Sequence, residues 1–331
     1  MTDVPVIQTY VLDKTEPKGL AFSVADVPVI QSGFRFKDEQ GVERHALDYT
    51  MTNTFLTCAL KFMEEYVKGI TLKRQKVSLG FGGAVHHGLA HLYRTGNVAE
   101  AARMASEHME DTEGEDVKTK RNAEILVAAY AQRYFPENWM ILDIETPIVF
   151  EFGPGLYHFV IPDMVVRENG RIYGVEHKTT RSISYNYFRQ FKPNQQLDGQ
   201  VAGIRAKYGM CDGIIINPIE IQKGGTKDRK TGVMRPSPYF GFGPRDISAR
   251  TDEDIEWWRR DMVEIYNDIG KRLQSGYFPA TRSACNDYEG CGFRELHLNH
   301  GDKYIQDEYY QPRTWNPMDR LAEGEAVNDN A

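Results

Sequence analysis

The alternation of apolar and polar positions divides this chain into helical and extended stretches. Apolar residues recur at helical spacing in the stretch 116–134, and helices are predicted there and near 53–67, 82–93, 98–108, 194–208 and 252–274. Extended runs predict strands near 140–151, 156–167, 171–178, 213–217 and 238–246, and short strands and turns are expected in 1–48. The central order of helices, three strands, helix and strand predicts an α/β (α+β) fold with a central mixed β-sheet flanked by helices.

The segment 162–178 predicts a β-hairpin that carries charged side chains. Asn169-Gly170 lies between two apolar runs, and such a pair favours a type I′ turn because both central residues need positive φ. A two-residue turn fixes the register, which places Asp163 opposite Glu176 and puts Lys178 on the same face. Opposed like charges are destabilising unless a divalent cation lies between them, so the pattern indicates a metal site. From spacing alone, the alternative is a solvated sheet face on which Lys178 neutralises the two acids.

The composition is typical of a soluble globular protein, at 41% hydrophobic and 11% aromatic residues. No apolar run approaches the roughly 20 residues of a membrane span, and the N-terminus has no basic and apolar regions of a secretion signal. We therefore expect no membrane association and a cytoplasmic location, either bacterial or, for a phage protein, in the host. The formal net charge of −7 argues against general electrostatic capture of nucleic acid, although local basic patches can still bind it.

Four short motifs follow one another in a defined order. They are Gly82-Gly-Ala-Val-His86, Pro162-Asp163, Glu176-His-Lys178 and Asn194-Gln-Gln196-Leu. In this order they resemble the PD-(D/E)xK nuclease superfamily, and more closely its RecB-like exonuclease branch, which includes phage recombination and CRISPR-adaptation nucleases. The resemblance covers about Asn53 to His297 and implies a restriction-endonuclease-like core with an N-terminal helical region. Gln200 departs from it, because many relatives carry Tyr there.

The resemblance implies a metal-dependent deoxyribonuclease, an exonuclease rather than a site-specific endonuclease. It would act on single- or double-stranded DNA in recombination, repair or phage DNA processing, with a recombination protein as partner. Asp163, Glu176 and His86 would bind Mg²⁺ or Mn²⁺, which can activate water and stabilise the charge that develops at phosphorus. Lys178 would stabilise the transition state, and Gln196 would orient the water or Lys178. The rival interpretations are a structure-specific or restriction-type endonuclease on the same core, and a DNA-binding or scaffold protein that has lost turnover.

Three further groups near these motifs are expected to be structural. His87 and His91 lie one helical turn apart, a spacing that suits zinc, but position 88 is not the Glu that His-Glu-x-x-His requires. Both are therefore expected to be ordinary core or surface histidines. Glu145 is expected to be a surface residue at a strand edge rather than an additional metal ligand.

The cysteines form a second constellation. The run from Cys285 through Cys291 to His297 resembles the C-terminal clamp of iron–sulfur members, where a cysteine near the N-terminus, here Cys58, joins the ligand set. His297 stands where those members have their last cysteine. The resemblance implies a C-terminal Cys/His clamp holding a four-iron–four-sulfur (4Fe–4S) cluster, while structural zinc and a metal-free remnant remain open alternatives. Cys211 begins an apolar strand and is expected to be a core residue.

These expectations divide the chain into a strand and turn region (1–48), a nuclease core with a helical insertion (49–278), the Cys/His clamp (279–300) and a polar tail (301–331) that frays after about Pro317. Basic residues in the loop 222–236 and before the histidine helix could contact phosphates, and aromatic residues after Lys178 could stack on bases. A solvated loop and core packing are the respective alternatives. The residues concerned are Lys223, Lys227, Arg229, Lys230, Arg235, Lys73, Arg74, Lys76, Tyr185, Tyr187, Phe188 and Phe191.

Overall fold

The computed structural model describes residues 7–12, 34–73, 77–109, 117–184, 186–225, 227, 231–286 and 290–313. The expected fraying after Pro317 and the residues Arg74, Lys76, Tyr185, Arg229 and Lys230 lie outside these ranges. The α-helices are α1 (Tyr49–Thr57), α2 (Ala59–Phe62), α3 (Val77–Thr95), α4 (Val98–Glu107), α5 (Lys120–Tyr134), α6 (Gln195–Tyr208), α7 (Asp252–Ser275), α8 (Arg294–Leu298) and α9 (Lys303–Tyr309). A π-helix (Met63–Val67) extends α2, and 3-10 helices span Tyr187–Phe191 and Arg282–Asn286. The strands are β1 (Tyr10–Val11), β2 (Phe34–Lys37), β3 (Glu43–Leu47), β4 (Ile70–Leu72), β5 (Met140–Ile144), β6 (Ile148–Gly153), β7 (Leu156–Val160), β8 (Met164–Glu168), β9 (Arg171–Thr180), β10 (Gly213–Gln222), β11 (Tyr239–Phe242), β12 (Asp246–Ser248) and β13 (Tyr310–Pro312).

Local sequence sets the ends of the two helices that organise the core. Asn194 caps α6 through its side chain, and Thr251 forms a reciprocal capping box with Asp254 at the start of α7. Both helices end at a glycine in the left-handed conformation, Gly209 with φ 78° and Gly276 with φ 67°. The predicted bounds 194–208 and 252–274 therefore agree with the structure to within a residue.

The hairpin predicted at 162–178 is formed by β8 and β9. Asn169 and Gly170 have φ values of 51° and 80°, as a type I′ turn requires. Pairing runs from Glu168 opposite Arg171 to Met164 opposite Val175, which confirms the predicted register. Asp163 directly precedes β8. Continuing the same register by one position beyond the Met164–Val175 pair places Asp163 opposite Glu176.

The hairpin belongs to a six-stranded mixed sheet with the order β11-β10-β9-β8-β5, in which β12 also pairs with β10. β8 is antiparallel to β5 and β9, whereas β10 is parallel to β9. The parallel pair is connected through α6, because parallel strands need a crossover and a helix provides it. This crossover places the first turns of α6 over the end of β9.

A second sheet, with five strands in the order β1-β6-β7-β3-β2, corrects the expectation of continuous strands at 140–151 and 156–167. Each of those stretches is two strands, and the chain passes between the sheets at the breaks. β5 and β8 pair in the six-stranded sheet, while β6 and β7 pair in the five-stranded sheet. Polar residues and prolines at 145–147 and 161–163 interrupt both runs, because proline cannot donate to a strand ladder.

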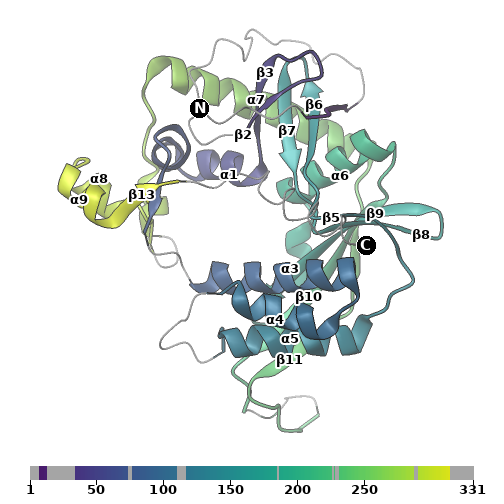
Figure 1. Ribbon diagram of the computed structural model, residues 1–331. Helices are drawn as coiled ribbons and strands as arrows, with labels where there is room; N and C mark the ends of the chain where they lie inside the picture. The colour runs from purple at the N-terminus through teal and green to yellow at the C-terminus, as the bar shows by residue number, and fades with distance from the viewer. Residues whose placement is uncertain are drawn as a thin grey trace.

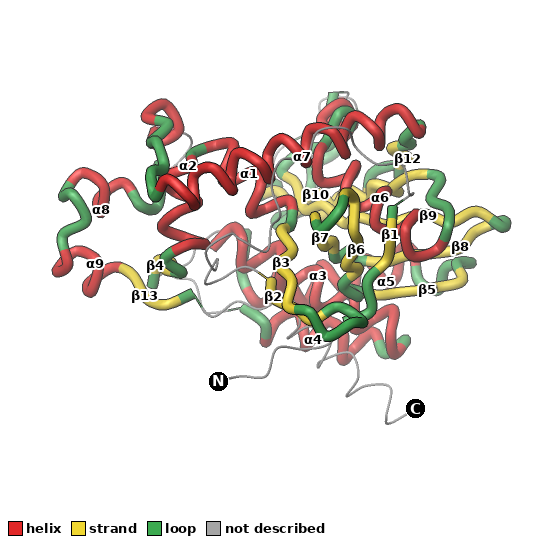
Figure 2. The backbone as a smooth tube through the Cα atoms, turned by 90° about the horizontal axis from the view of Figure 1, so that it is seen from above, coloured by secondary structure: helices red, strands yellow, loops and turns green. Residues whose placement is uncertain are grey.

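Helices cover the two faces of the six-stranded sheet differently. Figure 1 shows α3, α4 and α5 gathered on one side, where they share a buried cluster with β8, β9 and β10. On the other face α6 packs against β9 and β10 and also against β6 and β7, so that it lies between the two sheets. α7 packs against α6 and β6, and Figure 2 shows it running across that side of the molecule. Among the described residues, no helix is both long enough and apolar enough to span a membrane.

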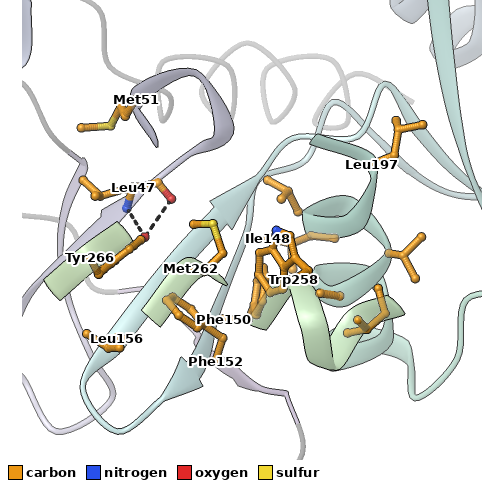
Figure 3. Packing of buried hydrophobic residues seen from close by; sticks show 14 of the residues in the cluster. Leu47, Met51, Ile148, Phe150, Phe152, Leu156, Leu197, Trp258, Met262 and Tyr266 are labelled. Atoms are coloured by element: carbon orange, nitrogen blue, oxygen red, sulfur yellow. Dashed lines mark hydrogen bonds between the residues drawn. The ribbon is translucent and has the colours of Figure 1, made fainter. Parts of the chain in front are cut away.

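The core between the sheets is rich in aromatic side chains from β6 and α7 (Figure 3). Trp258 packs against both Phe150 and Phe152, with ring centroids 6.0 and 5.7 Å away. The Tyr266 hydroxyl donates to the carbonyl of Tyr157 at 2.7 Å. It accepts from the Leu47 N–H at 3.2 Å, a bond drawn in Figure 3. One buried hydroxyl thus ties α7 to β3 and β7, where it satisfies backbone groups that water cannot reach.

A small C-terminal unit lies beside α2, away from the six-stranded sheet (Figures 1 and 2). β13 pairs with β4, and α8 and α9 pack with them around Ile70, Phe293, Leu296 and Tyr310. Residues 303–312 were expected to belong to a polar tail, but they form α9 and β13. The reason is long-range: Tyr310 is buried in this small core and Gln311 pairs with Thr71 of β4.

Candidate active site

The two acids that the sequence predicted, Asp163 and Glu176, both lie near the open end of the β8–β9 hairpin. Asp163 accepts the backbone N–H of His177 through Oδ2 at 2.7 Å. Glu176 is buried and points to the α6 side of the sheet, as Lys178 does two residues later. The two carboxylates therefore lie at one end of the sheet, between α3 on one side and α6 on the other.

His86 approaches Asp163 from α3. Its Nδ1 lies 3.0 Å from Asp163 Oδ1. Burial disfavours the imidazolium, but the carboxylates of Asp163 and Glu176 outweigh it and raise the pKa of His86 to about 9. Burial likewise opposes ionisation of Asp163, yet His86 and the neighbouring His177 hold the pKa of Asp163 well below its usual range. The pair is thus a buried imidazolium–carboxylate contact.

Glu145 completes a cluster with His86 and Asp163, a position that the sequence analysis considered for it but did not favour. Instead of lying on the surface, Glu145 is 8% exposed, and its backbone N–H donates to the Asp163 carbonyl at 3.0 Å. One ligand atom from each of His86, Glu145 and Asp163 lies within 4.8 Å of the other two. Within the described ranges, this is the one group of three or more His, Cys, Asp or Glu residues with that spacing.

The backbone of Glu145 explains how a residue at the end of an edge strand turns inward. Its φ is 48°, a left-handed conformation that is uncommon for residues other than glycine. Such strain of order 1–3 kcal/mol is often found at functional sites. The signal available in the sequence was the break Glu145-Thr-Pro between two apolar runs, but the break alone does not say which way the carboxylate points.

On the α6 side of the sheet, three side chains donate to the carboxylate of Glu176. Its Oε1 accepts from Lys178 Nζ at 2.5 Å and from Gln196 Nε2 at 3.1 Å, and its Oε2 accepts from Gln200 Nε2 at 2.7 Å. Gln196 and Gln200 lie one turn apart on α6, so both amides reach the same carboxylate. Gln200, which the sequence marked only as a departure from Tyr, therefore binds a predicted metal ligand directly.

Lys178 is positioned as a fixed cation beside the acids. Besides Glu176, its Nζ lies 3.3 Å from Gln196 Oε1, so Gln196 contacts both residues. Burial disfavours the ammonium group, but the carboxylate of Glu176 outweighs burial and raises the pKa of Lys178. The lysine stays protonated at neutral pH and can stabilise negative charge rather than act as a base.

A buried polar network supports the site from the α5 side of the sheet. The His177 ring accepts from Asn217 Nδ2 at 2.8 Å, and burial lowers the pKa of His177 to about 3, so the ring is neutral. Asn217 also contacts the Tyr130 hydroxyl at 2.7 Å and accepts from Arg245 Nε at 3.1 Å. Arg245 in turn forms an ion pair with Glu137. Because the His177 backbone holds Asp163, this network fixes the position of a predicted ligand.

The other candidate residues lie outside this centre. His87 stacks on His108 with ring centroids 4.6 Å apart, and His91 Nε2 lies 3.4 Å from Glu100, so both face α4. Tyr187 and Phe191 are buried in the core, and Phe188 packs against it. The described basic residues of the loop 222–236 lie beside β10 and β11. Arg235 donates to the Gln222 side chain, and its guanidinium lies over the Tyr239 ring. The backbone of Lys227 forms an isolated antiparallel β-bridge with Met234, and Lys223 directly follows β10. Lys73 Nζ donates to the Asp307 carbonyl of the C-terminal unit.

The three cysteines of the predicted clamp lie in one region of the structure. Cys58 breaks the helix that was predicted to be continuous over 53–67, and its sulfur accepts the N–H of Thr281 at 3.4 Å. Burial raises the pKa of Cys291, and the neighbouring sulfurs of Cys285 and Cys58 raise it further, so the three cysteines are electrostatic neighbours. Cys211 is buried in the main core, as expected.

His297 does not join the three cysteines in this structure. Its Nε2 lies 3.6 Å from Glu64 Oε1, and Glu64 is also paired with Lys68. An iron–sulfur cluster usually takes four thiolates, and structural zinc takes four Cys or His ligands. Among the described residues, no three of Cys58, Cys285, Cys291 and His297 have ligand atoms within 4.8 Å of one another, so the metal clamp stays a prediction.

The central cluster, in contrast, has a donor set that suits a divalent cation. It combines two carboxylates with the His86 ring, which would bind a cation only after losing its proton. Mg²⁺ and Mn²⁺ prefer carboxylate oxygens and retain several waters. Asp163 and Glu145 are both turned inward, so a cation bound between them would offset the repulsion between the two carboxylates. The residues present therefore fit the metal that the resemblance implies.

Comparisons with known proteins give a family match and a similar solved structure. The family model for the PD-(D/E)XK nuclease superfamily matches residues 47–296, more than half of the 331 residues. No curated protein gave a significant match. One similar solved structure, from Eubacterium rectale and provisionally described as an exonuclease, aligns with a TM-score of 0.45 and 16% identity, covering 71% of this chain and 84% of that one.

Proposed function

Because the chain belongs to the PD-(D/E)XK nuclease superfamily, we propose that it is a metal-dependent deoxyribonuclease that removes nucleotides from DNA ends. The observation that carries the proposal is the convergence of His86, Glu145 and Asp163 beside the Glu176–Lys178 pair. The exonuclease assignment is supported by the motif order shared with the RecB-like branch. A nuclease of this kind would meet its substrate in the cytoplasm of a bacterial cell or of a phage host.

Each side chain has a role that follows from its position. Asp163, Glu145 and His86 would hold Mg²⁺ or Mn²⁺, with Glu176 facing the same end of the sheet. When bound, such an ion activates water and offsets the charge that develops on the phosphate. Lys178 presents a buried, protonated amine that can stabilise the phosphate oxygens, and Gln196 restrains the amine by accepting from it.

A cleavage assay on linear DNA tests the proposal. Duplexes labelled separately at the 5′ and 3′ ends are incubated with Mg²⁺ or Mn²⁺, with a circular duplex in parallel. We expect metal-dependent loss of label from linear DNA, no cutting of the circle, and a roughly 10²–10³-fold slower rate for Lys178→Ala, the range seen when one stabilising donor is removed. Lys271→Ala is the matched control, because Lys271 lies on α7 and pairs with Asp268.

Other results of this assay would favour a different function or a different site for the activity. Cutting of the circle would replace the exonuclease assignment with an endonuclease on the same core. Equal cleavage by wild type, Lys178→Ala and Glu176→Ala would place the activity elsewhere or in a contaminant. A folded wild-type protein that binds DNA without cleaving it in either metal would instead be a DNA-binding or scaffold protein.

A further inference from the structure

A groove of about 760 Å³ lies on the face of α6 that points away from the candidate active site. The start of α6, the segment before it, α7 and the end of α1 form its walls. Gln195 lines the groove, whereas its neighbour Gln196 contacts Glu176 and Lys178. A ligand in the groove would therefore touch the same helical turn as the catalytic centre without entering that centre.

The groove is lined by apolar side chains, two of which are largely exposed. Trp257 is 72% exposed and Leu56 is 54% exposed, and the half-buried Ile265, which packs against the core, lines the groove with them. Neighbouring Trp258 is buried in the core, so the two adjacent tryptophans have opposite environments. Exposed apolar patches with a polar rim mark interaction sites, and tryptophan is among the residues that contribute most to interface affinity.

The rim of the groove is acidic once its internal ion pairs are counted. Lys192 lies 3.4 Å from Asp254, and Arg250 pairs with Asp198, so both cations are already matched. Asp261 and Glu264 follow Trp257 by one and two turns on α7, and both are exposed. Neither makes an ion pair with any residue that the structure describes. The uncompensated charge is therefore negative and lies directly beside the exposed indole.

We propose that this groove binds a cationic peptide segment of a partner protein. An apolar side chain of the segment packs on Trp257 and Leu56, and flanking Lys or Arg residues pair with Asp261 and Glu264. The rim would repel a phosphate backbone, which excludes DNA as the occupant. A second copy of the chain is disfavoured because each copy carries a formal net charge of −7. This inference does not depend on nuclease activity.

Fluorescence anisotropy with two labelled hexapeptide pools tests the proposal on the full-length protein without DNA. Both pools have Leu, Ile, Phe or Trp at the two central positions; one has Lys or Arg at the flanking positions, and the other has Asp or Glu. We expect binding of the cationic pool alone, weakened at least about tenfold by the double substitution Asp261→Lys, Glu264→Lys and also by Trp257→Ala. Glu124→Lys, an exposed acid on α5, is the matched charge control and should bind normally.

Four results would overturn the proposal. Three of them are no binding of the cationic pool to folded wild type, equal binding of the acidic pool, and undiminished binding to the folded double variant. Sedimentation provides the remaining test: a concentration-dependent dimer that Trp257→Ala abolishes would assign the groove to a second copy instead.

Discussion

Replacing Gln200 with alanine probes how the protein holds its predicted metal ligand Glu176. The Gln200 side chain is 3% exposed, and its Nε2 lies 2.7 Å from Glu176 Oε2. The substitution removes this donor and leaves a buried carboxylate oxygen with one hydrogen bond fewer. A hydrogen bond to a charged group contributes about 1.5–3 kcal/mol net, and full burial means that solvent does not screen it.

That free energy sets the expected size of the effect. At about 1.4 kcal/mol per factor of ten, it corresponds to a roughly 10–100-fold change. The same range is typical when the hydrogen-bond partner of a metal ligand is removed. We therefore expect the Mn²⁺ concentration that half-activates DNA cleavage to rise by about that factor in Gln200→Ala, because Glu176 is no longer fixed.

Two measurements separate positioning from folding. Calorimetric titration with Mn²⁺ reports binding without DNA, and thermal unfolding in a chelator reports the fold without metal. Gln195→Ala is the matched control, since Gln195 is the same residue type on the same helix but contacts Met262 Sδ at 3.0 Å. A Gln200→Ala protein with an unchanged Mn²⁺ midpoint, or a loss of equal size in Gln195→Ala, would refute the positioning role.

Four other predictions follow from particular contacts. Glu145→Gln should lower Mn²⁺ affinity by more than the roughly 10–100-fold typical of an outer partner, because it neutralises a carboxylate of the ligand cluster; calorimetry measures this. His297→Ala should leave the iron and zinc content of the purified protein unchanged, because the His297 ring is engaged by Glu64. Gly88→Ala should destabilise the fold by about 1–3 kcal/mol in urea unfolding, since the new Cβ would lie 2.9 Å from a backbone carbonyl oxygen of α4. Burial lowers the pKa of His158 to about 3. Below pH 6.5 the unfolded chain therefore takes up a proton at His158 while the folded chain does not, so the free energy of unfolding falls as the pH drops from about 6.5 to about 3. Between pH 7 and 5.5 His158 should account for about 1 kcal/mol of that fall, which a His158→Asn variant would not show.

These four predictions fail in distinct ways. Equal Mn²⁺ affinity of wild type and Glu145→Gln would place Glu145 outside the ligand set, with the exposed Glu124→Gln as control. Loss of iron or zinc in His297→Ala would make His297 a ligand despite its contact with Glu64. A Gly88→Ala protein as stable as wild type would mean that α3 and α4 can separate, and equal acid sensitivity of His158→Asn would assign the proton uptake to other groups.

The sequence by itself determined the parts of the site that depend on local geometry. The Asn169-Gly170 turn fixes the hairpin register, and the two-residue period of a strand places Glu176 and Lys178 on one face. The Asn194 cap fixes where α6 begins and therefore where Gln196 lies in its first turn. These features need only neighbouring residues, so a single sequence contains the information.

Tertiary structure alone decided the remaining contacts. Glu145 turns inward because β5 pairs with β8 in one sheet while β6 departs to another. The break Glu145-Thr-Pro marks where the two strands separate, but not which sheet each strand joins. Gln200 meets Glu176 only because α6 packs over β9, and His297 meets Glu64 only because α8 docks beside the π-helix. Contacts between residues far apart in sequence depend on how whole faces pack, and packing is decided by the summed burial of many side chains rather than by any one motif.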